Sequence, residues 1–148
     1  MKANEIRPIA ICVFRQGDRI LVAVGHDSVK HESFYRPIGG AIKFGEMGAE
    51  TLTRELREEL DAEISNLRYL GALENVFTYN GMQGHEIVLV YDGTFSDPSF
   101  YHSEELMGRE DDGTTFTAVW KSITELRSGS PLYPTGLMQL LENFTNRR

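Results

Sequence analysis

The sequence predicts an α/β/α sandwich, in which a central mixed β-sheet lies between helices. Two observations carry this prediction. Several short runs are rich in apolar and β-branched residues, as strands are, and two longer segments repeat apolar residues at the spacing of one helix face. Because each apolar face of a sheet must be covered, helices are expected on both sides of it.

Strands are expected in four places. Residues 9–14 (IAICVF) and 19–24 (RILVAV) flank the glycine-containing stretch RQGD and predict a β-hairpin with a tight turn. Residues 85–95 (HEIVLVYDGTF) and 116–121 (FTAVWK) are further strands. The unbroken apolar run 87–91 predicts a central strand that is covered on both faces.

Helices are expected at residues 49–60 and 135–144, where apolar side chains recur every three or four positions. Segments 30–34, 79–84 and 95–115 are polar or glycine-rich, and we expect them to be loops. The last of these is long enough to suggest a functional role.

Composition and charge narrow the class of protein. A chain of 148 residues is expected to form one domain, residues 1–148. No stretch approaches the roughly 18 apolar residues of a membrane span, and the first apolar run is too short for a signal peptide, so we expect a cytoplasmic protein without membrane contact. The net charge of −7 argues against binding a nucleic-acid polymer, but a small anionic substrate bridged by cations fits it.

Three glutamates share one face of the first expected helix. Glu55, Glu58 and Glu59 stand at i, i+3 and i+4, roughly 110° round from the leucine stripe. Their mutual repulsion and the negative end of the helix dipole make the cluster unfavourable by itself. On an arbitrary helix, a solvated acidic face is the ordinary explanation of such a pattern.

The loop before this helix favours a metal site instead. Gly39 and Gly40 end an extended segment and let the backbone approach a ligand closely. Gly45, Glu46 and Gly48 then bring the chain to the helix start, so loop carbonyls and carboxylates are expected to converge on one hard cation. Mg2+ prefers such oxygen ligands and keeps several waters, which suits a site that also holds phosphates.

These residues resemble the signature of the Nudix (MutT-type) hydrolase family, G-x5-E-x7-R-E-U-x-E-E-x-G-U, in which U is aliphatic. Six of its seven polar and glycine positions are occupied by Gly40, Glu46, Arg54, Glu55, Glu58 and Glu59. The sequence departs from the signature at the end, where Asp61 replaces the glycine and Ala62 the bulky aliphatic residue. Aspartate tolerates a left-handed backbone, so the helix exit is expected to survive. Flanking stretches such as HEIVLVY and LYPTGL extend the resemblance to a single Nudix domain.

The resemblance implies a Mg2+-dependent hydrolase, with Mn2+ as the alternative ion, that cleaves the phosphoanhydride bond of a nucleoside diphosphate linked to another moiety. It implies that the metal is bound by Glu55, Glu58, Glu59 and the main-chain carbonyl of Gly39. It also implies that Arg54 and Glu46 brace the helix against its loop. A surface pairing of Arg54 with Glu58, one turn along the helix, is the alternative for that arginine.

The general base is expected among these glutamates or in the segment 95–115. The candidates in that segment are Glu104, Glu105, Glu110, Asp111 and Asp112, and Glu110 and Asp112 are favoured because the following strand should return them to the cleft. The ordinary alternative for each of them is an acidic side chain that is simply solvated and has no catalytic role.

Substrate contacts are harder to assign. Arg36 is a candidate for a phosphate contact, and Tyr35, Phe77 and Tyr79 are candidates for stacking on a base, although aromatic residues at strand ends more often belong to the core or its rim. His85 and Glu86 begin a predicted strand, where we expect a hydrogen-bonded pair rather than cleft residues.

Several questions stay open at this point. Nucleoside triphosphates, ADP-ribose and other sugar nucleotides, and dinucleoside polyphosphates all fit the resemblance. A non-catalytic nucleotide-sensing domain of the same fold, which regulates a partner, is the alternative function; the intact glutamates argue against it. A homodimer is the default assembly, since dimers are the commonest oligomers.

Overall fold

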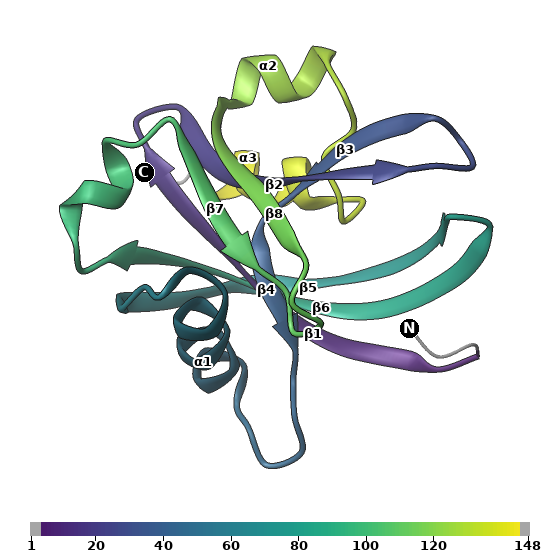
Figure 1. Ribbon diagram of the computed structural model, residues 1–148, viewed down its shortest axis with the longest axis horizontal. Helices are drawn as coiled ribbons and strands as arrows, with labels where there is room; N and C mark the ends of the chain where they lie inside the picture. Colours follow the sequence, from purple (N-terminus) through teal and green to yellow (C-terminus); the bar gives the residue numbers. More distant parts are fainter. Residues whose placement is uncertain (1–3, 146–148) are drawn as a thin grey trace.

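The computed structural model describes residues 4–145, which form an eight-stranded mixed sheet and three α-helices (Figure 1). Helix α1 (Gly48–Leu60) covers one face of the sheet, while α2 (Ile123–Ser128) and α3 (Leu137–Thr145) cover the other. The predicted α/β/α sandwich is therefore confirmed. Among the residues described, no helix has the length and apolar character needed to cross a membrane.

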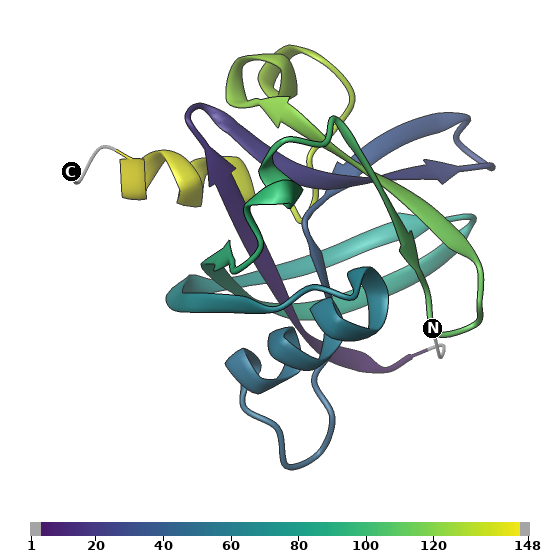
Figure 2. The ribbon, with the colours of Figure 1, turned by 60° about the vertical axis from the view of Figure 1, so that its left-hand side comes forward.

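The strands follow the spatial order β5–β6–β1–β2–β8–β7, with β4 beside β1 and β3 beside β2. Their bounds are β1 Ile6–Gln16, β2 Arg19–Asp27, β3 Glu32–Arg36, β4 Ile38–Ala41, β5 Ile64–Tyr79, β6 Met82–Phe95, β7 Glu105–Arg109 and β8 Thr115–Ser122. Strand β1 runs parallel to β6 and antiparallel to β4, and only its last two residues pair with β2. β1 thus joins two halves of the sheet, and the β2–β3 and β5–β6 hairpins reach the same side of the molecule (Figure 2).

Two apolar cores lie on opposite faces of the sheet. Alternate residues of β1 serve the two cores: Ile9, Ile11 and Val13 pack with α3, whereas Ala10, Cys12 and Phe14 pack with α1. A strand that is buried on both faces needs apolar residues at successive positions, not only at alternate ones. The strand that was expected to be central, β6, likewise lies in the interior of the sheet, between β5 and β1.

Most of the predicted elements are present. The β1–β2 hairpin turns at Gly17 and Asp18, as expected. Helix α1 begins at Gly48, one residue before the predicted start at residue 49. Helix α3 begins at Leu137, two residues after the predicted start at residue 135.

The three predicted loops are shorter than expected. Segment 30–34 contains the start of β3, segment 79–84 contains only a two-residue turn between β5 and β6, and segment 95–115 contains the short 3-10 helix η1 (Pro98–Tyr101) and β7. Pairing with a neighbouring strand stabilises these polar segments, and their composition does not reveal it.

Besides β3, β4 and β7, strand β5 and helix α2 are absent from the sequence-based prediction. Strand β5 pairs with β6 along its length, but shifts of register between Ser65 and Arg68 and between Tyr69 and Gly71 interrupt the two-residue alternation that marks a strand. Helix α2 is only six residues long. Its capping box, in which Ser122 and Glu125 exchange hydrogen bonds, is a signal that the sequence does contain.

Candidate metal centre and adjoining cavity

Helix α1 carries its acids to the edge of the sheet because its leucines are anchored in the core. Leu52 and Leu56 are fully buried, and they fix the rotation of the helix about its axis. Glu55 is only 4% exposed, because its carboxylate packs against β4 at Gly40. A β-carbon at Gly40 would overlap that carboxylate, so the glycine leaves room for it.

Three carboxylates converge beside this contact. Glu55 and Glu58 from α1 and Asp111 from the β7–β8 turn each place one oxygen within 4.8 Å of the others. Convergent carboxylate oxygens are the donors that Mg2+ prefers, so these residues fit a divalent cation.

Glu59 extends the acidic cluster. The pKa of Glu59 is raised to about 10 by burial, by a hydrogen bond with Glu55 and by the negative charges of Glu110, Glu55 and Asp111. Without a cation, Glu59 therefore keeps its proton at neutral pH, and a bound cation would favour its ionised form.

Arg54 links the acids of the helix to the preceding loop. Its Nε lies 2.7 Å from Glu46 Oε2, and its Nη1 lies 2.9 Å from Glu55 Oε1 and 3.3 Å from Glu58 Oε2. Its Nη2 also donates to the carbonyl of Ala41. The bracing contact and the alternative i, i+4 contact are thus both present.

Glu46 fastens the loop to the helix. Its Oε1 accepts hydrogen bonds from the Lys43 amide at 2.9 Å and the Thr51 hydroxyl at 3.0 Å, in addition to the bonds from Arg54. The bonds from Arg54 and Lys43 lower the pKa of Glu46 to about 2. A charged, fully bonded carboxylate holds the loop in one position relative to the acids.

The helix exit keeps the left-handed geometry in spite of the missing family glycine. Asp61 has φ 52° and ψ 40°, and its amide donates to the carbonyl of Arg57 at 3.0 Å. The amide of Ala62 donates to the carbonyl of Leu56 at 3.1 Å, and the bond from Asp61 to Arg57 is that of an αL helix exit.

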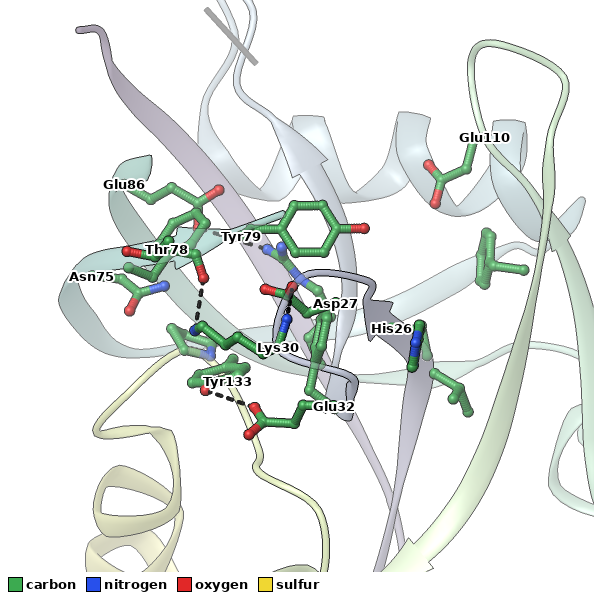
Figure 3. Close-up of a pocket in the computed structure, with 18 of the residues that line it drawn as sticks. His26, Asp27, Lys30, Glu32, Asn75, Thr78, Tyr79, Glu86, Glu110 and Tyr133 are labelled. Carbon is green, nitrogen blue, oxygen red and sulfur yellow. Dashed lines mark hydrogen bonds and ion pairs between the residues drawn. The ribbon is translucent and has the colours of Figure 1, made fainter. Parts of the chain in front are cut away.

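A cavity of about 480 Å³ adjoins the acidic cluster through the β7–β8 turn. Figure 3 shows residues that line this cavity. It is lined by parts of β2, β3, β5 and β6 and by the β7–β8 turn. That turn serves both places, since Glu110 lines the cavity while Asp111 joins the acidic cluster. A volume of this size is typical of small-molecule sites.

Aromatic rings cover glycines along the walls of the cavity. Phe34 lies over Gly25 and Phe77 lies over Gly84, and in each pair the two residues are direct cross-strand neighbours. A β-carbon at either glycine would overlap the phenyl ring. The rings therefore lie against the sheet and leave the cavity open.

The tips of two hairpins contact each other at Asp27, a residue that lines the cavity. Asp27 accepts hydrogen bonds from the amides of Val29 and Lys30 in its own turn and from the amide of Asn80 in the β5–β6 turn. Asn80 in return accepts from the amide of Ser28 at 2.8 Å. These bonds hold the two turns together and lower the pKa of Asp27.

The candidate residues chosen from the sequence fall into different places. Arg36, Phe77 and Tyr79 line the cavity, whereas Tyr35 packs against the core on the α3 side. Gly39 lies in β4, opposite Ile11 of β1.

The acids of segment 95–115 also lie in different places. Asp112 accepts two hydrogen bonds from Thr114, at 2.9 Å from the amide and 2.7 Å from the hydroxyl, and these bonds lower its pKa. Asp112 thus shapes the β7–β8 turn, and its neighbour Asp111 is the residue that reaches the acidic cluster. The sequence EDDGT signals a turn at this point, but not which acid faces the helix.

The sequence does not reveal the place of two cavity residues. Nothing in the sequence marks Asn75 of β5, and Glu86 does not form the expected strand-end pair, because β6 begins at Met82, four residues before Glu86. Both side chains are buried and line the cavity.

Comparison with known proteins agrees with this arrangement. The model of the NUDIX domain matches residues 5–136. The NAD-capped RNA hydrolase NudC of Pseudomonas aeruginosa (strain LESB58) is 30% identical over 80 residues, which are 54% of this chain and 28% of that protein. The chain therefore matches less than a third of the length of this curated relative.

Solved structures show the same fold. A NUDIX hydrolase from Nitrosomonas europaea has a TM-score of 0.64 at 20% identity, covering 97% of this chain and 90% of its own. The MutT NUDIX hydrolase from Burkholderia pseudomallei has the same TM-score and identity, covering 94% of this chain and 98% of its own.

The sandwich with an acidic helix at the edge of its sheet is the architecture of a Nudix hydrolase. Because the family model matches most of its length, the chain belongs to the Nudix family. The relatives matched here carry hydrolase names.

Proposed function

We propose that the protein is a Mg2+-dependent hydrolase that cleaves the phosphoanhydride bond of a nucleoside diphosphate linked to another moiety. The convergence of Glu55, Glu58 and Asp111 beside a nucleotide-sized cavity is the observation that carries this proposal. Mn2+ is the alternative ion, since it accepts the same oxygen donors.

The proposed metal ligands are Glu55, Glu58 and Glu59 of α1, with Asp111 and the carbonyl of Gly39. A divalent ion held there would neutralise charge on the phosphoryl oxygens and lower the pKa of bound water. Arg54 has a positioning role, because its guanidinium contacts both Glu55 and Glu58 and is itself fixed by Glu46. A rigid carboxylate set is what in-line attack by water requires.

The cavity supplies the second half of the proposed site. Glu110 stands on the β7–β8 turn between the acidic cluster and the cavity, where it is the candidate general base on grounds of position. Arg36 lines the same cavity and offers a positive charge to a phosphate. A nucleotide would thus place its base in the cavity and its phosphates at the acids.

A hydrolysis screen with and without Mg2+ tests this function. The panel contains nucleoside triphosphates, ADP-ribose, other sugar nucleotides and dinucleoside polyphosphates. It also contains NAD and NAD-capped RNA, because the Pseudomonas aeruginosa relative is named for that substrate. We expect turnover of at least one small phosphoanhydride that EDTA abolishes and that Glu58→Gln nearly removes.

The screen also separates the proposal from its alternative. A nucleotide-sensing domain would bind members of the panel and hydrolyse none of them, with or without Mg2+. That result would contradict the proposed function.

A further inference from the structure

The inner wall of the cavity holds two buried polar side chains with unpartnered oxygens. Asn75 is 4% exposed and Glu86 is 1% exposed, and they face each other directly across the antiparallel pair of β5 and β6. Across residues 4–145, nothing donates a hydrogen bond to Asn75 Oδ1 or to Glu86 Oε1. Buried acceptors without donors are unfavourable and call for a partner. Since both residues line the cavity, a bound molecule with N–H groups would supply it.

Two arginines approach Glu86 without satisfying it. Arg7 Nη1 lies 3.5 Å from Oε2, and Arg36 Nη2 lies 3.9 Å from Oε1. Both distances exceed the usual range of an N–H···O hydrogen bond. The two arginines therefore balance the charge of the carboxylate at distances longer than those of ordinary hydrogen bonds.

The three residues form a row across neighbouring strands. Arg7 of β1 pairs with Glu86 of β6, and Glu86 pairs with Asn75 of β5. Side chains of directly paired residues point to the same face of a sheet. The row therefore presents a donor, an acceptor and an acceptor.

The walls beside this row suit a flat ring. Phe77 and Phe34 each cover a glycine of the neighbouring strand with one side of the ring, while the residue lines the cavity. Aromatic rings in this position can stack on a planar ligand. Figure 3 shows Asn75 and Glu86 on one side of the cavity and Glu110 on the other.

We infer that the cavity binds a guanine base, with Glu86 and Asn75 accepting hydrogen bonds from the ring N–H and the exocyclic amine. One edge of guanine presents an acceptor, a donor and a donor in sequence, which complements the row of Arg7, Glu86 and Asn75. Adenine and cytosine carry one amine beside an acceptor nitrogen, and uracil carries one N–H between two carbonyls. Only guanine provides two adjacent donors for the two unpartnered oxygens.

This inference rests on the proposed function and specifies its substrate as a guanosine diphosphate derivative. The base would lie against Glu86 and Asn75, and the phosphates would extend past Glu110 toward Asp111 and the acidic helix. The β7–β8 turn, which contributes to both places, fixes the base relative to the acids.

The test is nucleotide binding without metal or turnover, measured by isothermal titration calorimetry in EDTA. GMP, IMP, AMP and UMP are the probes. IMP differs from GMP only in lacking the exocyclic amine. We expect GMP to bind at least about tenfold more tightly than IMP, AMP or UMP, because a site with buried polar groups discriminates against a ligand that leaves them unpaired.

Substitutions assign the preference to the two residues. Glu86→Gln and Asn75→Leu should each bring the affinity for GMP close to that for IMP. Glu74→Gln is the matched control: it also removes a charge, but Glu74 is exposed on the opposite face of β5 and should leave the ratio unchanged. Gly84→Ala, which moves the Phe77 ring into the cavity, should weaken all four nucleotides alike.

Equal affinities for the four nucleotides would overturn the inference, as would a GMP preference that survives both substitutions. Asn75→Leu leaves the ion pairs of Glu86 intact. Its ratio of GMP to IMP affinity therefore tests the inference even if Glu86→Gln does not fold. Mg2+-dependent hydrolysis of adenosine or uridine compounds alone would refute the guanine site and leave the proposed function standing. GMP-selective binding without hydrolysis of any guanosine diphosphate derivative would support the guanine site and contradict the proposed function.

Discussion

The carboxylate of Glu55 lies directly against Gly40, at a place where a β-carbon would overlap it. The two residues come from α1 and β4, so this contact sets the distance between the acidic helix and the sheet. The absence of a side chain at Gly40 therefore has a local function: it allows a buried carboxylate to point toward Glu58 and Asp111.

Gly40→Ala should displace Glu55 and weaken metal binding more than it weakens the fold. The added methyl group meets a carboxylate that is held by Arg54, and overpacking of this kind costs about 1–3 kcal/mol of stability. We expect a folded protein whose Mg2+ affinity, measured by calorimetry, falls at least about tenfold. Ala41→Ser, at the exposed next position, is the control and should bind Mg2+ normally. Unchanged affinity in Gly40→Ala would show that Glu55 is not a ligand.

Glu58→Gln or Glu59→Gln should lower turnover by at least about a hundredfold, because each removes a charge that stabilises the transition state through the metal. Steady-state kinetics on the best substrate of the panel measures the effect. Glu50→Gln, in the first turn of the same helix, keeps an oxygen that can accept from the Met47 amide and should stay near the wild-type rate. Near wild-type rates in both Glu58→Gln and Glu59→Gln would exclude the metal site described above.

The metal-free protein should lose stability as the pH rises. The folded pKa of Glu59, about 10, lies above the ordinary value of 4.5, so the folded state binds a proton that the unfolded state releases between these values. This contribution to stability is fully present below pH 4.5 and is lost as the pH rises toward the folded pKa.

Thermal melts in EDTA between pH 5.5 and pH 8.5 measure this effect. Glu59→Gln cannot release the proton and should show a smaller decrease in melting temperature over that range, and saturating Mg2+ should have the same consequence in the unsubstituted protein. An equal decrease in Glu59→Gln would mean that another group carries the pH dependence.

Asp61→Gly should stabilise the protein by about 0.5–1 kcal/mol, because glycine adopts a left-handed backbone without the cost of a β-carbon. Asp61 has that conformation at the exit of α1. The measurement is a denaturant titration, with the hydrolysis rate as a second readout that should barely change. Clear destabilisation would show that the Asp61 side chain makes a stabilising contact of its own.

The acidic helix was predictable because its information is local. The spacing of Leu52 and Leu56 fixes the buried stripe, and the same spacing places the glutamates beside it. The sequence also indicated the left-handed exit at Asp61, since few residues other than glycine and aspartate suit it.

The cavity was not predictable in the same way. Asn75 and Glu86 meet only because β5 pairs with β6, and the register shifts in β5 hide that strand from a periodicity argument. Likewise, the choice between Asp111 and Asp112 depends on which acid forms the turn with Thr114. Such contacts follow from strand pairing between distant segments, which residue order alone does not determine.

The position of bond cleavage is the most direct test of the central claim that α1 holds a cation which directs water to phosphorus. The best substrate is hydrolysed in 18O-labelled water with Mg2+, and the products are analysed by mass spectrometry. Carboxylates on a rigid helix can position water only beside the phosphorus that the cation contacts, so 18O should appear on a phosphate-containing product. Label found only on a sugar hydroxyl would show cleavage at carbon and would contradict the account.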